Sequence, residues 1–434
     1  MQENPHKLVI LLIFVLLVGG YACMAAYYPL AYIWATYEDL IGEWAQTYFF
    51  LAATILSVLV AMQRSHYRWF FMVLAVACSY VVLEEISWGQ RIFDFSTPDF
   101  LKSRNLQGEA NLHNLLTGPH KTLLKDLISV AVAIGLFGYG FIYPLLRSRG
   151  WRIAQWVDKM GAAAPPMVLA PFFVLAAYFE LKPFSFNEAE IAELLVATAL
   201  AMTALHYLFA IRRGLSATAS SWSRNDSLLF GRWLIIMSTA IVAIAALTTV
   251  AFYSAPGNES RINGRIERGI EKFAGRYKKH DRCDIANELY EMLLQKDPQR
   301  VYLLRQMATC YKRLEQSAMF DQTIAAAISI DLRIYAEDPW RASVNQSLVR
   351  SYRLAGSKEI AQRHLEEALT IGIARIEEHA DSAKAAYSFG RTLQLADRRE
   401  EAFEQFSRAY DIDRTSSKYR KAYFSARAYL ESHR

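Results

Sequence analysis

The sequence lacks the short motifs that identify many soluble enzymes and nucleic-acid-binding proteins. It contains no phosphate-binding loop, dinucleotide-binding glycine motif, HExxH zinc motif or serine nucleophile elbow. RNP-like runs, zinc-finger spacings and basic heptads are absent too, and the net charge of +6 is spread over the whole chain. We therefore expect no nucleic-acid partner, and we predict no cofactor.

Charged residues are scarce in the first part of the chain, up to about residue 255, and dense after it. A hydrophobic share of 53% with a mean hydropathy of only +0.09 favours two unlike parts over one ordinary globular fold. We predict an all-α fold with a polytopic transmembrane bundle at 1–254, a linker at 255–266 and an α-solenoid at 267–434. A long outer loop at 89–122 interrupts the bundle.

The first part contains seven apolar windows that approach the length of a membrane-spanning helix. They are 8–30, 44–62, 69–88, 123–146, 162–181, 191–211 and 228–252. The fifth window contains prolines that would kink a helix, so whether 162–181 fully spans decides the number of passes. The first window could instead be a signal peptide cleaved before Cys23, although its apolar run continues past that cysteine.

Arginine and lysine gather in the loops after the second, fourth and sixth windows, which read QRSHYRW, RSRGWR and IRRG. The alternate loops are acidic or mixed. Because basic loops tend to stay in the cytoplasm, we predict a multi-pass protein of the bacterial inner (plasma) membrane with a cytoplasmic N-terminus. Everything after residue 253 would then be periplasmic or extracellular.

The second part repeats itself with a period of about 34 residues. Each unit predicts two antiparallel helices; the units are 267–300, 301–334, 342–375 and 383–416, followed by a capping helix at 417–432. Small residues such as Ala274, Ala308 and Gly390 would let the paired helices approach closely. One pair cannot bury its own apolar face, so four pairs would stack.

This pattern of large and small residues resembles the tetratricopeptide repeat (TPR) family over about 150 residues. The resemblance implies a superhelical scaffold whose concave surface binds a protein or a peptide. It does not imply an enzyme. The alternative is a generic array of helical hairpins with the same packing and no ligand.

The four cysteines provide a separate test of this arrangement. Cys23 and Cys78 fall in predicted membrane helices. Cys283 should begin the second helix of the first repeat, and Cys310 should lie late in the first helix of the second repeat. Because these helices would be antiparallel, the two thiols could be neighbours and form a disulfide in an oxidising compartment. The alternative is two buried thiols.

The stretch VVLEEISWGQRIFDFSTP ends an apolar window in two adjacent carboxylates, Glu84 and Glu85. Together with Arg91, Glu109 and His113 of the following loop, they could form a cluster at the outer membrane surface. Such a cluster could do general acid/base work. Glu109 and His113, four residues apart, could also hold a metal, although one such pair falls short of the three or four ligands that a catalytic site needs. The alternative is structural: a salt bridge from Arg91 to a glutamate.

The combination EEISWGQR, TP and NLQGEANLHN resembles a segment of uncharacterised bacterial multi-pass membrane proteins, which implies no activity. Two functions remain open. The first is a periplasmic TPR scaffold for protein–protein interaction in envelope assembly, export or polysaccharide-related machinery, with the lipid bilayer as its anchor. The second is a membrane-embedded enzyme acting on a lipid-linked or glycan substrate through the Glu/His/Arg cluster. Transport is disfavoured because charges within the apolar windows are scarce.

Overall fold

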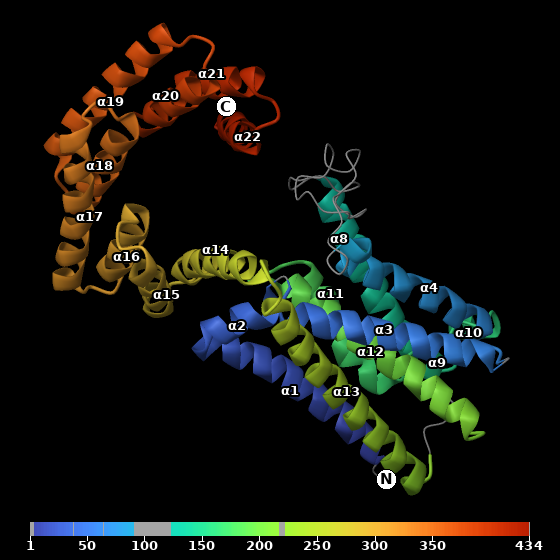
Figure 1. Cartoon of the computed structure of the whole chain (residues 1–434). Helices are drawn as coiled ribbons and strands as arrows, with labels where there is room; N and C mark the ends of the chain where they lie inside the picture. The colour runs from blue at the N-terminus through green and yellow to red at the C-terminus, as the bar shows by residue number, and fades with distance from the viewer. Residues whose placement is uncertain (1–3, 38, 64, 91–122, 217–221, 434) are drawn as a thin grey trace. The chain divides into compact units, whose positions relative to one another are not determined.

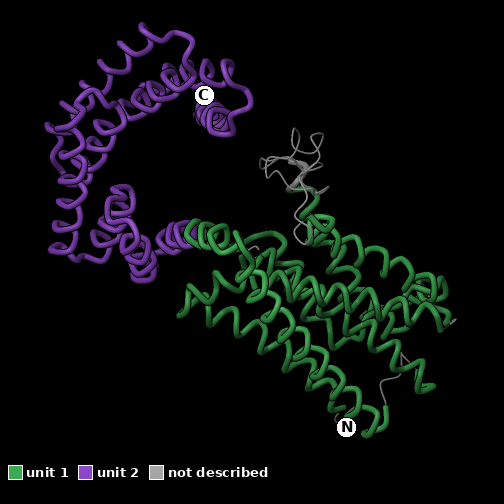
Figure 2. Tube along the Cα trace, viewed as in Figure 1, with its two compact units in different colours: residues 1–269 green, residues 270–434 purple. Residues whose placement is uncertain are grey.

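The computed structural model describes residues 4–37, 39–63, 65–90, 123–216 and 222–433 (Figure 1). The described residues are all-α, with no strand among them. They divide into two compact units, residues 1–269 and 270–434 (Figure 2).

Unit 1 is a bundle of helices of very different lengths. Its helices are α1 Pro5–Tyr27, α2 Pro29–Thr36, α3 Ile41–Met62, α4 Arg68–Glu85, α8 Leu123–Phe137, α9 Tyr143–Ser148, α10 Arg152–Lys159, α11 Ala170–Glu180, α12 Glu188–Arg212 and α13 Arg224–Tyr253. Single turns at η1 Ser87–Gly89, η2 Gly138–Ile142 and η3 Met167–Leu169 join or extend them.

The centre of unit 1 is the pair α3 and α12. α3 packs against α4, α12 and α13, while α11 packs against α8 and α12 (Figure 1). Alanines at the seam, including Ala53, Ala197 and Ala201, are fully buried and let the helix backbones approach closely. α12 is apolar on nearly all sides, and such a helix is expected to lie in the interior of a bundle.

The surrounding helices turn apolar side chains outward instead. Leu16 of α1, Val76 of α4, Ile134 of α8 and Leu247 of α13 each leave more than half of their surface exposed. Apolar surface of this extent is unusual for a protein surrounded by water.

Among the described residues, five stretches are long and apolar enough to cross a membrane. They are Pro5–Tyr27, Pro29–Met62, Asp126–Ser148, Glu188–Arg212 and Arg224–Tyr253. The sequence predicts seven spans. The predicted spans 69–88 and 162–181 correspond to α4 and to the shorter apolar helix Met167–Glu180, and neither is among the five. The chain around Pro165 and Pro166 is not helical, which shortens the second of these.

Polar contacts gather at two places in unit 1. At the first, called here the basic end, Arg147 contacts Tyr67 and the C-terminal part of α12, and His6 Nδ1 lies 2.6 Å from Ser227 Oγ. At the second, called the acidic end, Gln46 contacts Glu85 of α4 and Glu193 of α12.

Unit 2 is an array of helix pairs that begins within α14, Asn258–Lys279. The following helices are α15 Cys283–Lys296, α16 Val301–Arg313, α17 Ser317–Glu337, α18 Ala342–Ala355, α19 Lys358–Glu378, α20 Ala383–Leu395, α21 Arg399–Ile412 and α22 Ser417–Ser432. Two of these helices fall at each predicted repeat, although α14 begins before 267 and α17 and α19 run past 334 and 375. Residues 255–266, predicted as a linker, are helical from Asn258 onward, and the boundary between the units falls inside α14.

Every helix pair in unit 2 turns in the same way. A residue with positive φ follows the first helix of each pair: Asp281, Glu315, Gly356 and Asp397. The next residue donates its backbone N–H to the carbonyl five positions back, at 2.9 to 3.0 Å in all four turns. This is the Schellman pattern, which satisfies carbonyls at the end of a helix. The recurrence identifies four structurally equivalent TPR-like helical repeats.

The packing within the repeats agrees with the predicted pattern, in which small residues lie next to large ones. Ala274 and Ala308 are fully buried. A Cβ atom at Gly390 would lie 2.7 Å from Phe406 Cε1, so the glycine is what allows α20 to approach α21. First helices also pack on one another, α16 on α18 and α18 on α20, along the inner side of the arc in Figure 1.

Candidate functional site

Glu84 lies at the end of α4, where the predicted carboxylate pair begins. Its side chain is buried, and its Oε1 accepts a hydrogen bond of 2.7 Å from Trp88 Nε1. The intervening backbone is strained, because Ser87 and Trp88 have φ values of 48° and 54°. Such strain persists only where surrounding packing enforces it, and it is frequent at functional sites.

Glu85 belongs to a three-residue contact at the acidic end, the Gln46 bridge. The buried Gln46 amide donates to Glu85 Oε1 at 3.1 Å and to Glu193 Oε2 at 2.5 Å. One amide thereby holds two carboxylates from helices that are remote in sequence. The amide satisfies one acceptor on each carboxylate without offsetting their negative charge.

Other carboxylates at this end have evident structural tasks. Glu188 accepts backbone N–H groups of Phe184 and Phe186 at 2.5 and 2.7 Å, just before the start of α12. Asp39 is buried and forms an ion pair with Arg265. The Gln46 bridge differs from both, because a neutral amide brings together two acidic groups from separate helices. This makes the bridge the candidate site.

The remaining predicted members of the cluster, Arg91, Glu109 and His113, lie outside the described residues. The cluster as a whole, and the metal site at Glu109 and His113, therefore stay predictions. Within the described ranges, no three His, Cys, Asp or Glu side chains are grouped closely enough to hold a metal ion.

Sequence reasoning missed Gln46 and Glu193, although a signal was available. Both fall inside windows that are predicted to cross the membrane, at 44–62 and 191–211. A polar or ionisable residue inside such a window is a functional-site hypothesis by default. Gln46 and Glu193 are therefore candidates for the same reason as Glu84 and Glu85, which end another apolar window.

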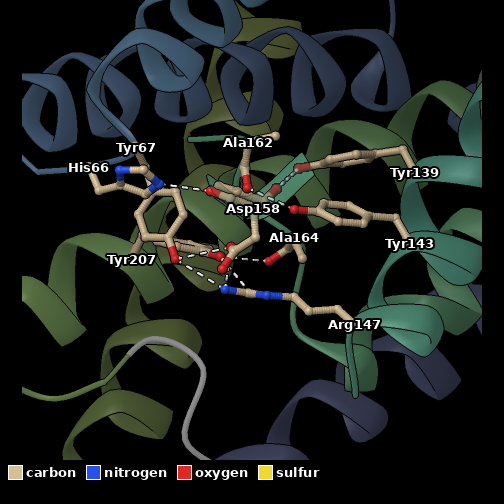
Figure 3. Close-up of polar contacts among 10 residues, drawn as sticks. His66, Tyr67, Tyr139, Tyr143, Arg147, Asp158, Ala162, Ala164 and Tyr207 are labelled. Carbon is tan, nitrogen blue, oxygen red and sulfur yellow. Dashed lines mark hydrogen bonds and ion pairs between the residues drawn. The ribbon is translucent and has the colours of Figure 1, made fainter. Parts of the chain in front are cut away.

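The basic end contains a second polar network, centred on Arg147 (Figure 3). Its guanidinium lies 2.6 Å from Asp158 Oδ1 and donates to the hydroxyl of Tyr67 at 3.0 Å. Tyr67 in turn donates to Asp158 Oδ1 at 3.3 Å. The ion pair is only partly exposed, and the two tyrosines around it supply the further hydrogen bonds that a desolvated pair needs.

Three tyrosine hydroxyls explain how a non-helical segment can be accommodated beside this network. Figure 3 shows Tyr139, Tyr143 and Tyr207 reaching the backbone at residues 162–164. They donate to the carbonyls of Ala163, Ala162 and Ala164 at 3.1, 2.9 and 2.9 Å. Away from water, non-helical backbone needs such partners. We interpret this network as structural.

The inner side of the repeat array carries arginines on three successive first helices. Arg305 of α16 lies 3.6 Å from Asp331 and donates to Ser347 Oγ at 2.5 Å. Arg391 of α20 donates to the hydroxyl of Tyr387 at 3.1 Å. Lys418 lies 4.1 Å from the centre of the same tyrosine ring, so two cations flank it.

Arg350 of α18 stands between these two arginines in the order of the repeats. Burial and repulsion from Arg391 and Arg305 lower the pKa of Arg350 to about 10. No described residue forms a hydrogen bond or an ion pair with its guanidinium. A partly buried arginine that faces other arginines is stabilised by an incoming anion.

Cys283 and Cys310 are neighbours in the repeat array. Cys283 begins α15 and Cys310 lies late in α16; both are buried, and neither is in a disulfide. Burial and a hydrogen bond with Cys283 raise the pKa of Cys310 to about 12. The disulfide itself stays a prediction.

No protein-family model matches the chain, and no curated protein matches it. Among solved structures, the crystal structure of a thermophilic TPR protein from Thermus thermophilus aligns over 43% of this chain and 94% of that one, with 16% sequence identity and a TM-score of 0.23. The repeats of this chain are therefore identified from their own helix pairs and turns.

Proposed function

We propose that this protein is a membrane-anchored scaffold whose repeat array binds an acidic segment of a protein partner along its inner side. One observation carries the proposal: Arg305, Arg350 and Arg391 occupy three successive first helices, and Arg350 has no anionic partner among the described residues. Solenoids of this kind present extended concave binding surfaces. Acidic side chains would supply the missing counter-charge.

The outward apolar faces of α1, α4, α8 and α13 support the membrane anchor. Between the basic and the acidic end the chain runs seven times, through α1, α3, α4, α8–α9, η3–α11, α12 and α13. The two runs that are short or interrupted lie against longer helices, α4 on α3 and α11 on α12. We infer that all seven runs lie in the bilayer.

The distribution of charge supports a sidedness for this anchor. Arg147 and the neighbouring basic loops share one end, which we assign to the cytoplasm. Arg265, in the part of α14 that belongs to unit 1, forms an ion pair with Asp39 at the acidic end. The repeats would then lie in the periplasm or outside the cell, where envelope assembly, export or polysaccharide-related machinery would supply the partner.

Sidedness can be tested with reporters fused to the C-terminus of the full chain. We expect alkaline phosphatase to be active there and green fluorescent protein to be dark, because only the first matures outside the cytoplasm. The opposite result would place the repeats in the cytoplasm and exclude an envelope partner, while leaving the inner-face binding surface intact.

The binding surface can be tested with the full-length protein in mild detergent and a fluorescent Asp/Glu-rich peptide as probe. Reversing two charges with Arg350→Glu and Arg391→Glu should weaken binding at least tenfold, since each lost charge-assisted contact is worth about 1.5–3 kcal/mol. Lys358→Glu with Arg363→Glu reverses two charges at exposed positions of the second helix α19 and is the matched control. Equal weakening of peptide binding by the control would show that the effect comes from net charge and not from the inner side of the array.

The Gln46 bridge favours a second function, an enzyme that acts at the acidic end on a lipid-linked or glycan substrate. Two carboxylates held by one amide could serve as the general acid and the general base that cleavage of a glycosidic bond requires. Glu85→Gln and Glu193→Gln, made separately, would each abolish the cellular function if the site is catalytic. Full function with both variants would leave the scaffold as the sole role.

A further inference from the structure

A groove opens on unit 1 between α12 and α13. Its volume is about 490 Å³, within the range of ~300–1000 Å³ typical of small-molecule sites. Leu56 of α3 contributes to its lining. The other lining residues are Leu205, Leu208, Phe209, Arg212 and Arg213 near the end of α12, and Leu229, Trp233, Ile236 and Met237 of α13.

The walls of the groove are apolar along their length. On α12, Leu205, Leu208 and Phe209 recur at helical spacing and form one face. On α13, Trp233 and Ile236 leave 50% and 57% of their surface exposed, although they line the groove. An open apolar groove of this kind suits a flexible hydrocarbon chain better than a compact polar ligand.

The mouth of the groove is positively charged. Arg212 is the last residue of α12 and Arg213 follows it, and both are exposed. Neither forms an ion pair in the part of the chain that the structure describes, and the Arg213 guanidinium lies 5.8 Å from the centre of the Phe209 ring. The groove therefore combines an apolar interior with two cationic groups at one end.

We propose that this groove binds an anionic phospholipid, with one acyl chain between α12 and α13 and the phosphate at Arg212 and Arg213. The proposal rests on the membrane placement given above. Lipids that merely surround a protein are held by their chains and show little headgroup preference. A groove that ends in two arginines without an ion-pair partner in the described chain selects by headgroup charge as well.

The test is native mass spectrometry of the full-length protein in detergent, with phosphatidylglycerol and phosphatidylcholine of identical chains as probes. Wild type should retain phosphatidylglycerol preferentially. Arg212→Gln with Arg213→Gln should weaken that binding about thirtyfold, the factor that two basic groups near a lipid surface together contribute. Arg149→Gln with Arg152→Gln removes two exposed charges outside the groove and is the matched control.

A second variant separates the chain from the headgroup. Ile236→Trp fills the groove from an exposed position, so it should expel the lipid without disturbing the core. Equal retention of the two lipids, undiminished phosphatidylglycerol binding by the Arg212/Arg213 variant, or displacement by inorganic phosphate alone would overturn the proposal. Release of the protein from membranes by alkaline carbonate would instead refute the membrane placement itself.

Discussion

The two units of this protein are built from contacts of very different range. In unit 2 each helix packs mainly on helices nearby in sequence, and the same turn recurs at Asp281, Glu315, Gly356 and Asp397. In unit 1 the main seam joins α3 to α12, and the Gln46 bridge joins residues 39 and 147 positions apart. We therefore expect a destabilising substitution in unit 2 to loosen only the neighbouring helices. A destabilising substitution in unit 1 should loosen helices that are remote in sequence.

The strongest test of local behaviour is Phe406→Ala. This ring is buried against Gly390 and Leu393, and its loss should cost about 3–5 kcal/mol. Hydrogen exchange of the full-length protein in detergent should show faster exchange in α20, α21 and α22 only. Phe424→Ala, at a half-exposed position of α22, is the control and should change little. Faster exchange in α3 and α12 would contradict the independence of the two units.

The cysteine pair tests the array in a way that depends on its compartment. If the repeats lie in an oxidising compartment, Cys283 and Cys310 should form a disulfide that adds about 3 kcal/mol to the array. Alkylation after unfolding without reductant should then label only Cys23 and Cys78. Labelling of all four cysteines would place the array in a reducing environment or rule out the bond.

In the reduced protein, we expect the stability of the repeat array to depend on pH through Cys310. Because the pKa of Cys310 is raised from 9.0 to about 12, the folded array favours the protonated thiol. The contribution of the Cys310 thiol to stability is fully present below pH 9 and is lost as the pH rises toward 12. Cys310→Ala should flatten this part of the denaturation profile measured in reductant. An unchanged slope between pH 9 and 12 would show that Cys310 titrates normally.

Gln46→Leu tests the long-range character of unit 1. The change deprives Glu85 and Glu193 of their shared donor, at a cost of about 1–3 kcal/mol. Hydrogen exchange should accelerate in α3, α4 and α12 together, although these helices are remote in sequence. Gln63→Leu, an exposed position at the end of α3, serves as the control. Acceleration confined to α3 would mean that the bridge does not couple the helices.

The same contrast explains what the sequence could predict. Helix pairs of unit 2 were predictable because small residues such as Ala274, Ala308 and Gly390 recur at equivalent positions, although the repeated turns lie 34, 41 and 41 residues apart. This local pattern determines which neighbouring helices touch. In unit 1, hydropathy located the apolar segments but could not reveal that Gln46 meets Glu193, because that contact depends on how α3 packs on α12. The interruption at Pro165 was expected from proline, whereas the tyrosine hydroxyls that satisfy the adjacent carbonyls come from three separate positions.

The repeated turn itself should respond only weakly to substitution. Glu315 has φ 57°, a conformation that costs a non-glycine residue about 1–2 kcal/mol, whereas Gly356 adopts it freely at the equivalent position. Glu315→Gly should therefore stabilise the array, but by less than about 1 kcal/mol, because glycine also increases the entropy of the unfolded chain. Gly356→Ala reverses the exchange and should destabilise it. Denaturant unfolding measures the change in the free energy of unfolding for each variant. If the turns are equivalent, the two changes should have opposite signs. Changes of the same sign would show that the repeats do not share one turn geometry.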